Sequence, residues 1–226
     1  MNIWRVLSLL FGLTMLAIAL APPLAQFAHN DFRGHMLQHL LLGMLAPLGL
    51  VFAAPVTLLL GALSASRARS IVIVLQSRPV HFVSHPVTAL LLNVGGMYLL
   101  YLTPLYAATL DNHWLHALVH IHFILAGCLF TWAIAGPDPG PSRPSLYYRL
   151  VILFISMASH ATLAKLMYAY GWPLDTPHDL TEIQAGAQLM YYGGDLAELL
   201  LLIALFCAWY RAHRHDGRRR ERLLLR

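Results

Sequence analysis

The sequence predicts an all-α fold, a membrane-embedded bundle of six transmembrane helices with both termini in the cytoplasm. Hydrophobic residues make up 58% of the 226 residues and charged residues only 11%, and the mean hydropathy is +0.62. So few charges could not cover the surface of a soluble domain. The apolar residues are gathered into stretches of roughly 20 residues, the length that crosses the hydrocarbon core. The basic residues lie between these stretches, as the positive-inside rule predicts.

The six predicted spans follow one another with short connections. They are expected at residues 6–21, 36–63, 87–108, 114–135, 150–170 and 186–210. The first is expected to remain as an anchor, because Pro22 directly follows Ala19-Leu20-Ala21, the sequence that resembles a signal-peptidase site. Pro47 and Pro55 predict kinks in the second span.

Two connecting segments have a distinct composition. Residues 136–145 (GPDPGPSRPS) are rich in Pro and Gly and disfavour a helix. Residues 70–86 are apolar but too short to span, and Arg78-Pro79 interrupts them. This second segment is therefore expected to lie on the inner membrane surface.

The arginines and lysines set the orientation. With the N-terminus inside, thirteen of the fifteen fall on the cytoplasmic side, Arg33 falls outside, and Lys165 lies within the fifth span. Seven of the thirteen form a basic cytoplasmic tail, 211–226, which follows a single transmembrane domain, 1–210. We expect the tail to rest against anionic lipid headgroups, with docking of a partner as the alternative.

Composition and motifs also exclude several functions. The net charge is +5, but the basic residues flank the spans and form no face for nucleic acid. Cys128 and Cys207 lie in apolar stretches without a CxxC spacing, so neither a disulfide framework nor a zinc knuckle is expected. Because the sequence has no recognisable pairing of nucleophile and base and no phosphate loop, we do not expect an enzyme.

Histidines in helical register are the main functional signal. His35 and His39 open the second span, and His116 and His120 open the fourth. Both spans run from outside to inside, and residues four apart share a helix face, so the topology places four imidazoles at one depth near the outer surface. Lipid selects strongly against ionisable side chains without partners. We therefore predict that these four histidines hold a metal ion; hydrogen bonds to carbonyls and headgroups are the alternative.

Other polar and sulfur-containing side chains are expected near this layer. Further metal donors are predicted at four positions: Met36, His113, His160 and Met190. For His160, a hydrogen bond near Asp195 or Lys165 is an equal alternative, and His122 and His178 are expected to be structural. Lys165, Asp195 and Glu198 are predicted to be buried, with the lysine forming an ion pair with the two carboxylates.

The donor types favour copper. Imidazole suits copper, zinc, iron and nickel, and neighbouring thioethers favour Cu(I). The alternative is a b-type haem with histidines as axial ligands. A haem needs clearance for its ring, which Gly34 and Gly43 could provide on the second span but which the bulky Leu118 and Phe123 on the fourth oppose.

Three blocks of the sequence resemble one known family. Residues 34–55 (GHMLQHLLLGMLAPLGLVFAAP), 101–110 (YLTPLYAATL) and 113–139 (HWLHALVHIHFILAGCLFTWAIAGPDP) are similar to conserved blocks of the multi-spanning CtaG family, assembly factors for caa3-type cytochrome c oxidase. The similarity covers roughly residues 30–210. Family members often carry a His before the proline of the second block, where this chain has Leu102-Thr103-Pro104, and the acidic-Gln motif is only loosely matched at 182–184. These differences suggest a divergent branch.

The resemblance implies a multi-pass protein of the bacterial inner membrane that helps to mature a haem–copper oxidase. Combined with the histidine layer, it predicts that His35, His39, His116 and His120 bind copper and pass it laterally to an oxidase subunit. The rivals are an electron-transfer protein with haem b, a metal-free oxidase scaffold, and a transporter that uses Lys165, Asp195 and Glu198. The absence of a sequence repeat disfavours the transporter.

Overall fold

The computed structural model describes residues 3–138 and 144–224, with side chains as far as Arg211. Every regular element in these ranges is helical. Five segments are long and apolar enough to cross a membrane: α1 (Ile3–Leu20), the series Phe32–Ala62, α10 (His113–Ala135), α11 (Leu146–Tyr170), and Leu180–Arg211 of α12 (Leu180–Leu224). A sixth is present if α8 (Pro86–Tyr101) and α9 (Leu105–Asp111) are one bent span. The predicted all-α membrane bundle is confirmed, while the compartment of each terminus stays a prediction.

The third predicted span, 87–108, is not one straight helix. α8 and α9 meet at an angle of 74°. Pro104 has no N–H for a helical hydrogen bond and disfavours the α conformation of the residue before it. The Thr103 hydroxyl donates instead to the carbonyl of Leu99, in the last turn of α8. The break turns α9 away from α8 and brings Tyr106 towards the histidines described below.

The second predicted span is the most buried of the five. In its 18-residue apolar stretch, 61% is buried within the protein, against 11% for the corresponding stretch of α1. It consists of α3 (Phe32–Leu40), the π-helical turn η1 (Leu41–Leu45), α4 (Ala46–Phe52) and α5 (Pro55–Ala62). Pro47 opens α4 and Pro55 opens α5, after Ala54 in the left-handed conformation with φ of 57°. Both proline positions therefore interrupt the regular helix, as predicted, because proline removes a backbone donor.

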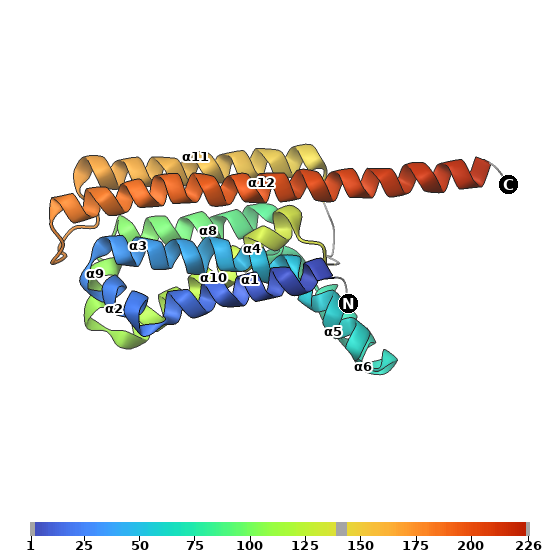
Figure 1. Ribbon diagram of the computed structural model, residues 1–226, viewed down its shortest axis with the longest axis horizontal. Helices are drawn as coiled ribbons and strands as arrows, with labels where there is room; N and C mark the ends of the chain where they lie inside the picture. The colour runs from blue at the N-terminus through green and yellow to red at the C-terminus, as the bar shows by residue number, and fades with distance from the viewer. Residues whose placement is uncertain (1–2, 139–143, 225–226) are drawn as a thin grey trace.

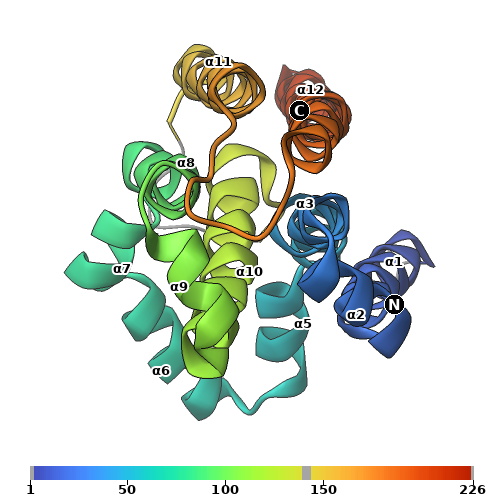
Figure 2. The same ribbon diagram turned by 90° about the vertical axis from the view of Figure 1, so that its left-hand side faces the viewer.

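Both chain termini lie at the same end of the bundle (Figure 1). We call the opposite end the distal end; it carries α2 (Pro22–Asn30), α9 and the α11–α12 connection (Figure 2). α10 packs against α8, η1, α4 and α12, and α3 packs against α12. α6 (Ala65–Leu75) and α7 (Arg78–Val83) contain no buried residues. These two short helices cover the stretch that was predicted to lie on a membrane surface.

Glycines allow two helix pairs to touch through their backbones. A Cβ on Gly49 of α4 would lie 2.4 Å from the Gly12 nitrogen of α1, and a Cβ on Gly127 of α10 would lie 2.0 Å from the Gly43 oxygen of η1. Small residues permit this approach where two helices cross in a membrane. The second contact holds α10 against the series that carries His35 and His39.

The predicted boundary between domain and tail coincides with no break in the backbone. α12 continues as one helix through Leu224. Residues 139–143 of the predicted Pro/Gly connector and the side chains of the tail after Arg211 lie outside the described residues.

Candidate metal centre

The distal end of α3 places the first histidine pair inside the bundle. Asp31 caps this helix, because its side chain accepts a hydrogen bond of 2.8 Å from the Arg33 amide. His35 and His39 follow on one face, and only 4% and 3% of their surfaces are exposed. The cap thus fixes where α3 begins and how deep the two imidazoles lie.

The second pair lies on the facing helix. His116 and His120 of α10 are half-buried, and their ring centroids are 4.3 Å apart at an interplanar angle of 88°. Both lie close enough to His35 to contribute to its electrostatic environment, as does His39. The structure thus places two of the predicted histidines on α3 and two on α10, and within the described ranges it gathers no three of them around one point; whether they bind metal stays a prediction.

The two histidines of α3 differ in their hydrogen bonds. His35 Nε2 lies 3.1 Å from the Tyr101 hydroxyl. His39 has no hydrogen-bond partner for either ring nitrogen within the described part of the chain. Its ring packs against Phe123 at 4.5 Å and Tyr101 at 6.1 Å between centroids. His35 is thus oriented by a phenol, whereas His39 keeps both nitrogens available to a ligand.

A third helix brings a similar imidazole to the same region. His160 of α11 is 1% exposed, and neither ring nitrogen has a partner among the described residues. It lies within electrostatic range of His39. Its ring occupies the space above Gly194 of α12, where an added Cβ would lie 2.0 Å from the ring carbon Cε1. The alternative interpretation placed His160 near Asp195 or Lys165, and neither of these residues forms a hydrogen bond with its ring among the described residues.

The helices that carry His39 and His160, together with α12, also carry buried thioethers. Met36 of α3, Met167 of α11 and Met190 of α12 each have 0% exposure and belong to the main hydrophobic core. Met36 and Met190 were predicted as further donors. Met167, which is seven residues after His160 on the same helix, was left out of that prediction. The core formed by α3, α11 and α12 therefore contains both buried imidazole and buried thioether groups.

The predicted trio of buried ionisable residues is corrected in part. Lys165 is exposed, and its ammonium lies 5.4 Å from the Tyr191 ring centroid. No ion pair joins it to Asp195 or Glu198, all three of which the structure describes. The long lysine side chain reaches the surface of α11 instead of the bundle interior. Asp195 is half-buried, and Glu198 is buried as expected, with one oxygen accepting a hydrogen bond from Ser156.

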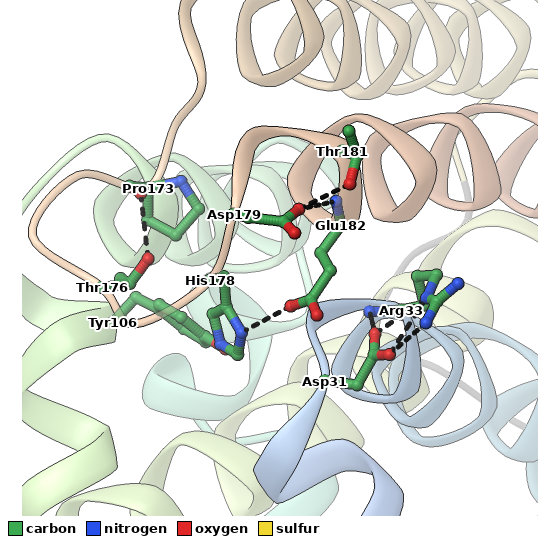
Figure 3. A network of polar contacts seen from close by, with 9 residues as sticks. All are labelled: Asp31, Arg33, Tyr106, Pro173, Thr176, His178, Asp179, Thr181 and Glu182. Atoms are coloured by element: carbon green, nitrogen blue, oxygen red, sulfur yellow. Dashed lines mark hydrogen bonds and ion pairs between the residues drawn. The ribbon is translucent and has the colours of Figure 1, made fainter.

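Three other histidines named in the sequence analysis have structural contacts or lie at the surface. His113 is exposed at the start of α10 beside Trp114. His122 Nε2 lies 3.0 Å from the Leu92 carbonyl oxygen. His178 contacts the Tyr106 hydroxyl at 3.1 Å and the Glu182 carboxylate at 3.2 Å, next to the Asp31–Arg33 pair (Figure 3). The structural interpretations of His122 and His178 agree with these contacts, whereas the role of His113 as a metal donor stays a prediction.

Aromatic residues from the bent span complete the distal wall, and sequence reasoning missed them. Tyr101 and Tyr106 are fully buried and pack around Phe32 and His35. Their positions on either side of the Pro104 break were visible in the sequence. The break itself was not predicted, so neither tyrosine was assigned to the site.

The donor set fits a soft metal better than a haem. No three His, Cys, Asp or Glu side chains within the described ranges are already arranged around one point for a metal ion. A two-imidazole site with thioethers is still a set that Cu(I) accepts. The clearance that haem requires is filled: a Cβ on Gly34 would lie 2.6 Å from the Phe27 backbone, and the space by Gly43 holds the His39 ring.

Comparisons with known proteins agree with the architecture. The family model for the cytochrome c oxidase caa3 assembly factor matches residues 1–212. Uncharacterized proteins of Mycobacterium leprae and Mycobacterium bovis are each 31% identical over 242 aligned positions, which cover 98% of this chain. The chain spans only 37% of the length of these relatives. No solved structure matches.

Proposed function

Because this chain belongs to the cytochrome c oxidase caa3 assembly factor family, we propose that it binds copper among the buried histidines of α3, α10 and α11. In this function it delivers the ion to a haem–copper oxidase subunit in the same bilayer, a bacterial inner membrane. It acts as a binding protein and not as an enzyme.

The observation that supports copper binding most strongly is the state of His39 and His160. Each imidazole is almost completely buried with both ring nitrogens unpartnered among the described residues. A buried polar group without a partner costs about 1–3 kcal/mol. A ligand that binds both rings would remove this cost, and imidazole nitrogen is a metal ligand.

The surrounding residues suggest how the ion is held. His116 and His120 are half-buried on α10 and are more accessible to an ion than His39 and His160. His39 and His160 are more deeply buried, and α3, α11 and α12 also carry the buried thioethers of Met36, Met167 and Met190, a donor type that favours the cuprous state. Imidazole and thioether ligands exchange more readily than a closed thiolate site, which suits transfer to a client. Tyr101 orients His35 and thereby supports the wall of the site.

The proposal is tested by measuring metal content. The full chain is produced with added copper and purified in detergent, and copper per chain is measured by mass spectrometry alongside a visible spectrum. We expect about one copper per chain, with most of it lost in His39→Gln and His160→Gln. His122→Gln is the matched control, since His122 bonds a backbone carbonyl outside the site.

Three results would contradict this function. A Soret band with stoichiometric iron would identify a haem protein. Unchanged copper in both His39→Gln and His160→Gln would refute the ligand assignment. A copper-free protein that still restores oxidase activity in a deletion strain would identify a scaffold.

A further inference from the structure

A carboxyl group near the middle of the α12 span is buried with one oxygen unpartnered. Glu198 is 3% exposed. Its Oε1 accepts a hydrogen bond of 3.3 Å from the Ser156 hydroxyl of α11, and Oε2 has no partner within the described part of the chain. A carboxyl at this depth in a membrane is costly and marks a functional position. The histidine site does not use it.

A small cavity adjoins this carboxyl. It has a volume of about 20 Å³ and is lined by Glu198 together with Asn93 of α8 and Thr131 of α10. Gly43 of η1 and Gly127 of α10 also line it. A cavity needs about 10–15 Å³ to hold one water-sized particle, so this one has room for a single water or a bare small ion.

The lining chemistry differs from that of the histidine site. The polar side chains in its lining offer carboxylate, amide and hydroxyl oxygens. One lining residue, Met44, contains sulfur. Oxygen ligands suit hard cations. One carboxylate balances one positive charge, whereas a divalent ion would leave a net charge inside the bundle.

We infer that Glu198, Asn93 and Thr131 form a binding site for one small monovalent cation, with Na⁺ as the ion to test. The site is distinct from the histidines and does not depend on copper binding. Its three ligand residues come from α8, α10 and α12, so a bound cation joins three helices. Because only the folded bundle assembles these ligands, the ion stabilises that bundle.

Thermal unfolding of the detergent-purified full chain tests the site. The unfolding temperature Tm is compared in NaCl and in choline chloride at equal ionic strength, since choline is too large for the cavity. At a Na⁺ concentration a hundred-fold above Kd we expect Tm to rise by about 5 °C or more. Glu198→Gln, which keeps the shape but not the charge, abolishes the rise. Asp195→Asn is the matched control: Asp195 is half-buried on the same helix but does not line the cavity, so the rise persists.

A second measurement keeps the inference testable if Glu198→Gln does not fold. Binding of radioactive ²²Na⁺ to the wild-type chain should saturate near one ion per chain. Thr131→Val, which removes one oxygen without changing the shape, should weaken this binding about five- to tenfold. Equal Tm values in Na⁺ and choline, or a Na⁺ response that survives in Glu198→Gln, would overturn the site and leave a cavity that holds only water. Neither result bears on copper content.

Discussion

Gly194→Ala displaces a predicted metal ligand without changing that ligand. The new Cβ would lie 2.0 Å from Cε1 of His160, whereas ordinary carbon contacts begin near 3.4 Å. The ring must therefore move by about 1.4 Å, and metal–ligand distances tolerate only about 0.2 Å. We expect copper content to fall sharply.

The stability of the bundle should change little in the same variant. Replacing Gly by Ala inside a helix stabilises it by about 1 kcal/mol. Moving a packed side chain costs about 1–3 kcal/mol. The net loss is at most about 2 kcal/mol, which lowers Tm by roughly 4–8 °C. The variant thus separates the site from the fold.

The assay pairs copper content with thermal unfolding of the same purified sample. Gly95→Ala on α8 is the matched control, because no atom lies within 4 Å of its added Cβ. This control should keep its copper and gain up to about 1 kcal/mol of stability. If Gly194→Ala retains wild-type copper while it folds normally, His160 is not a ligand and the reasoning from its unpartnered nitrogens fails.

Three further predictions concern stability. Gly127→Ala should destabilise the bundle by about 3 kcal/mol, because its Cβ would lie 2.0 Å from the backbone oxygen of Gly43, which no rotamer change can move; a Tm equal to that of Gly95→Ala would contradict this. Asp138→Ala should lower the free energy of unfolding by about 2–3 kcal/mol, because the carboxylate accepts hydrogen bonds from the Val56 and Thr57 amides and the Thr57 hydroxyl at the start of α5. We expect faster hydrogen exchange at those two amides, and unchanged exchange would refute the cap. The pKa of Asp31 lies below its ordinary 3.8, chiefly because the Arg33 side chain hydrogen-bonds to it. A lowered pKa gives stability that is present above the ordinary value and lost as pH falls through the lowered one, so Tm should drop as the pH falls below about 4. Asp31→Asn should lack this component, and an identical pH profile for the variant would contradict the assignment.

Hydropathy predicted the spans because crossing lipid requires a length of apolar chain that depends little on tertiary contacts. It could not predict how the third span ends. The bend at Pro104 depends on what α9 packs against after the end of α8. The burial of Tyr101 and Tyr106 beside the histidines depends on the same packing. A proline near a span end is compatible with either a straight stop or a bent pair.

Helical spacing predicted that His35 and His39 share one helix face and that His116 and His120 share another, and the rings of the second pair do lie 4.3 Å apart between centroids. Whether the two pairs converge on one ion stays a prediction. Spacing could not show which ring nitrogens lack a hydrogen bond, because that depends on residues distant in the sequence. The Tyr101 hydroxyl is within hydrogen-bond distance of His35 Nε2, whereas no residue that the structure describes bonds to either nitrogen of His39. The error at Lys165 has a similar origin. The prediction that Lys165 is buried followed from its depth in the span. The side chain instead lies on the exposed face of α11, with its ammonium group over the Tyr191 ring.

The backbone contact between Gly43 and Gly127 also limits how an ion can travel. The backbones of η1 and α10 touch at Gly43 and Gly127. Sliding of α10 along the series that carries His35 and His39 would break this contact. Under the proposed function, passage of a cation from His116 and His120 to His39 would therefore rely on rotation of the imidazole rings and not on sliding of the helices.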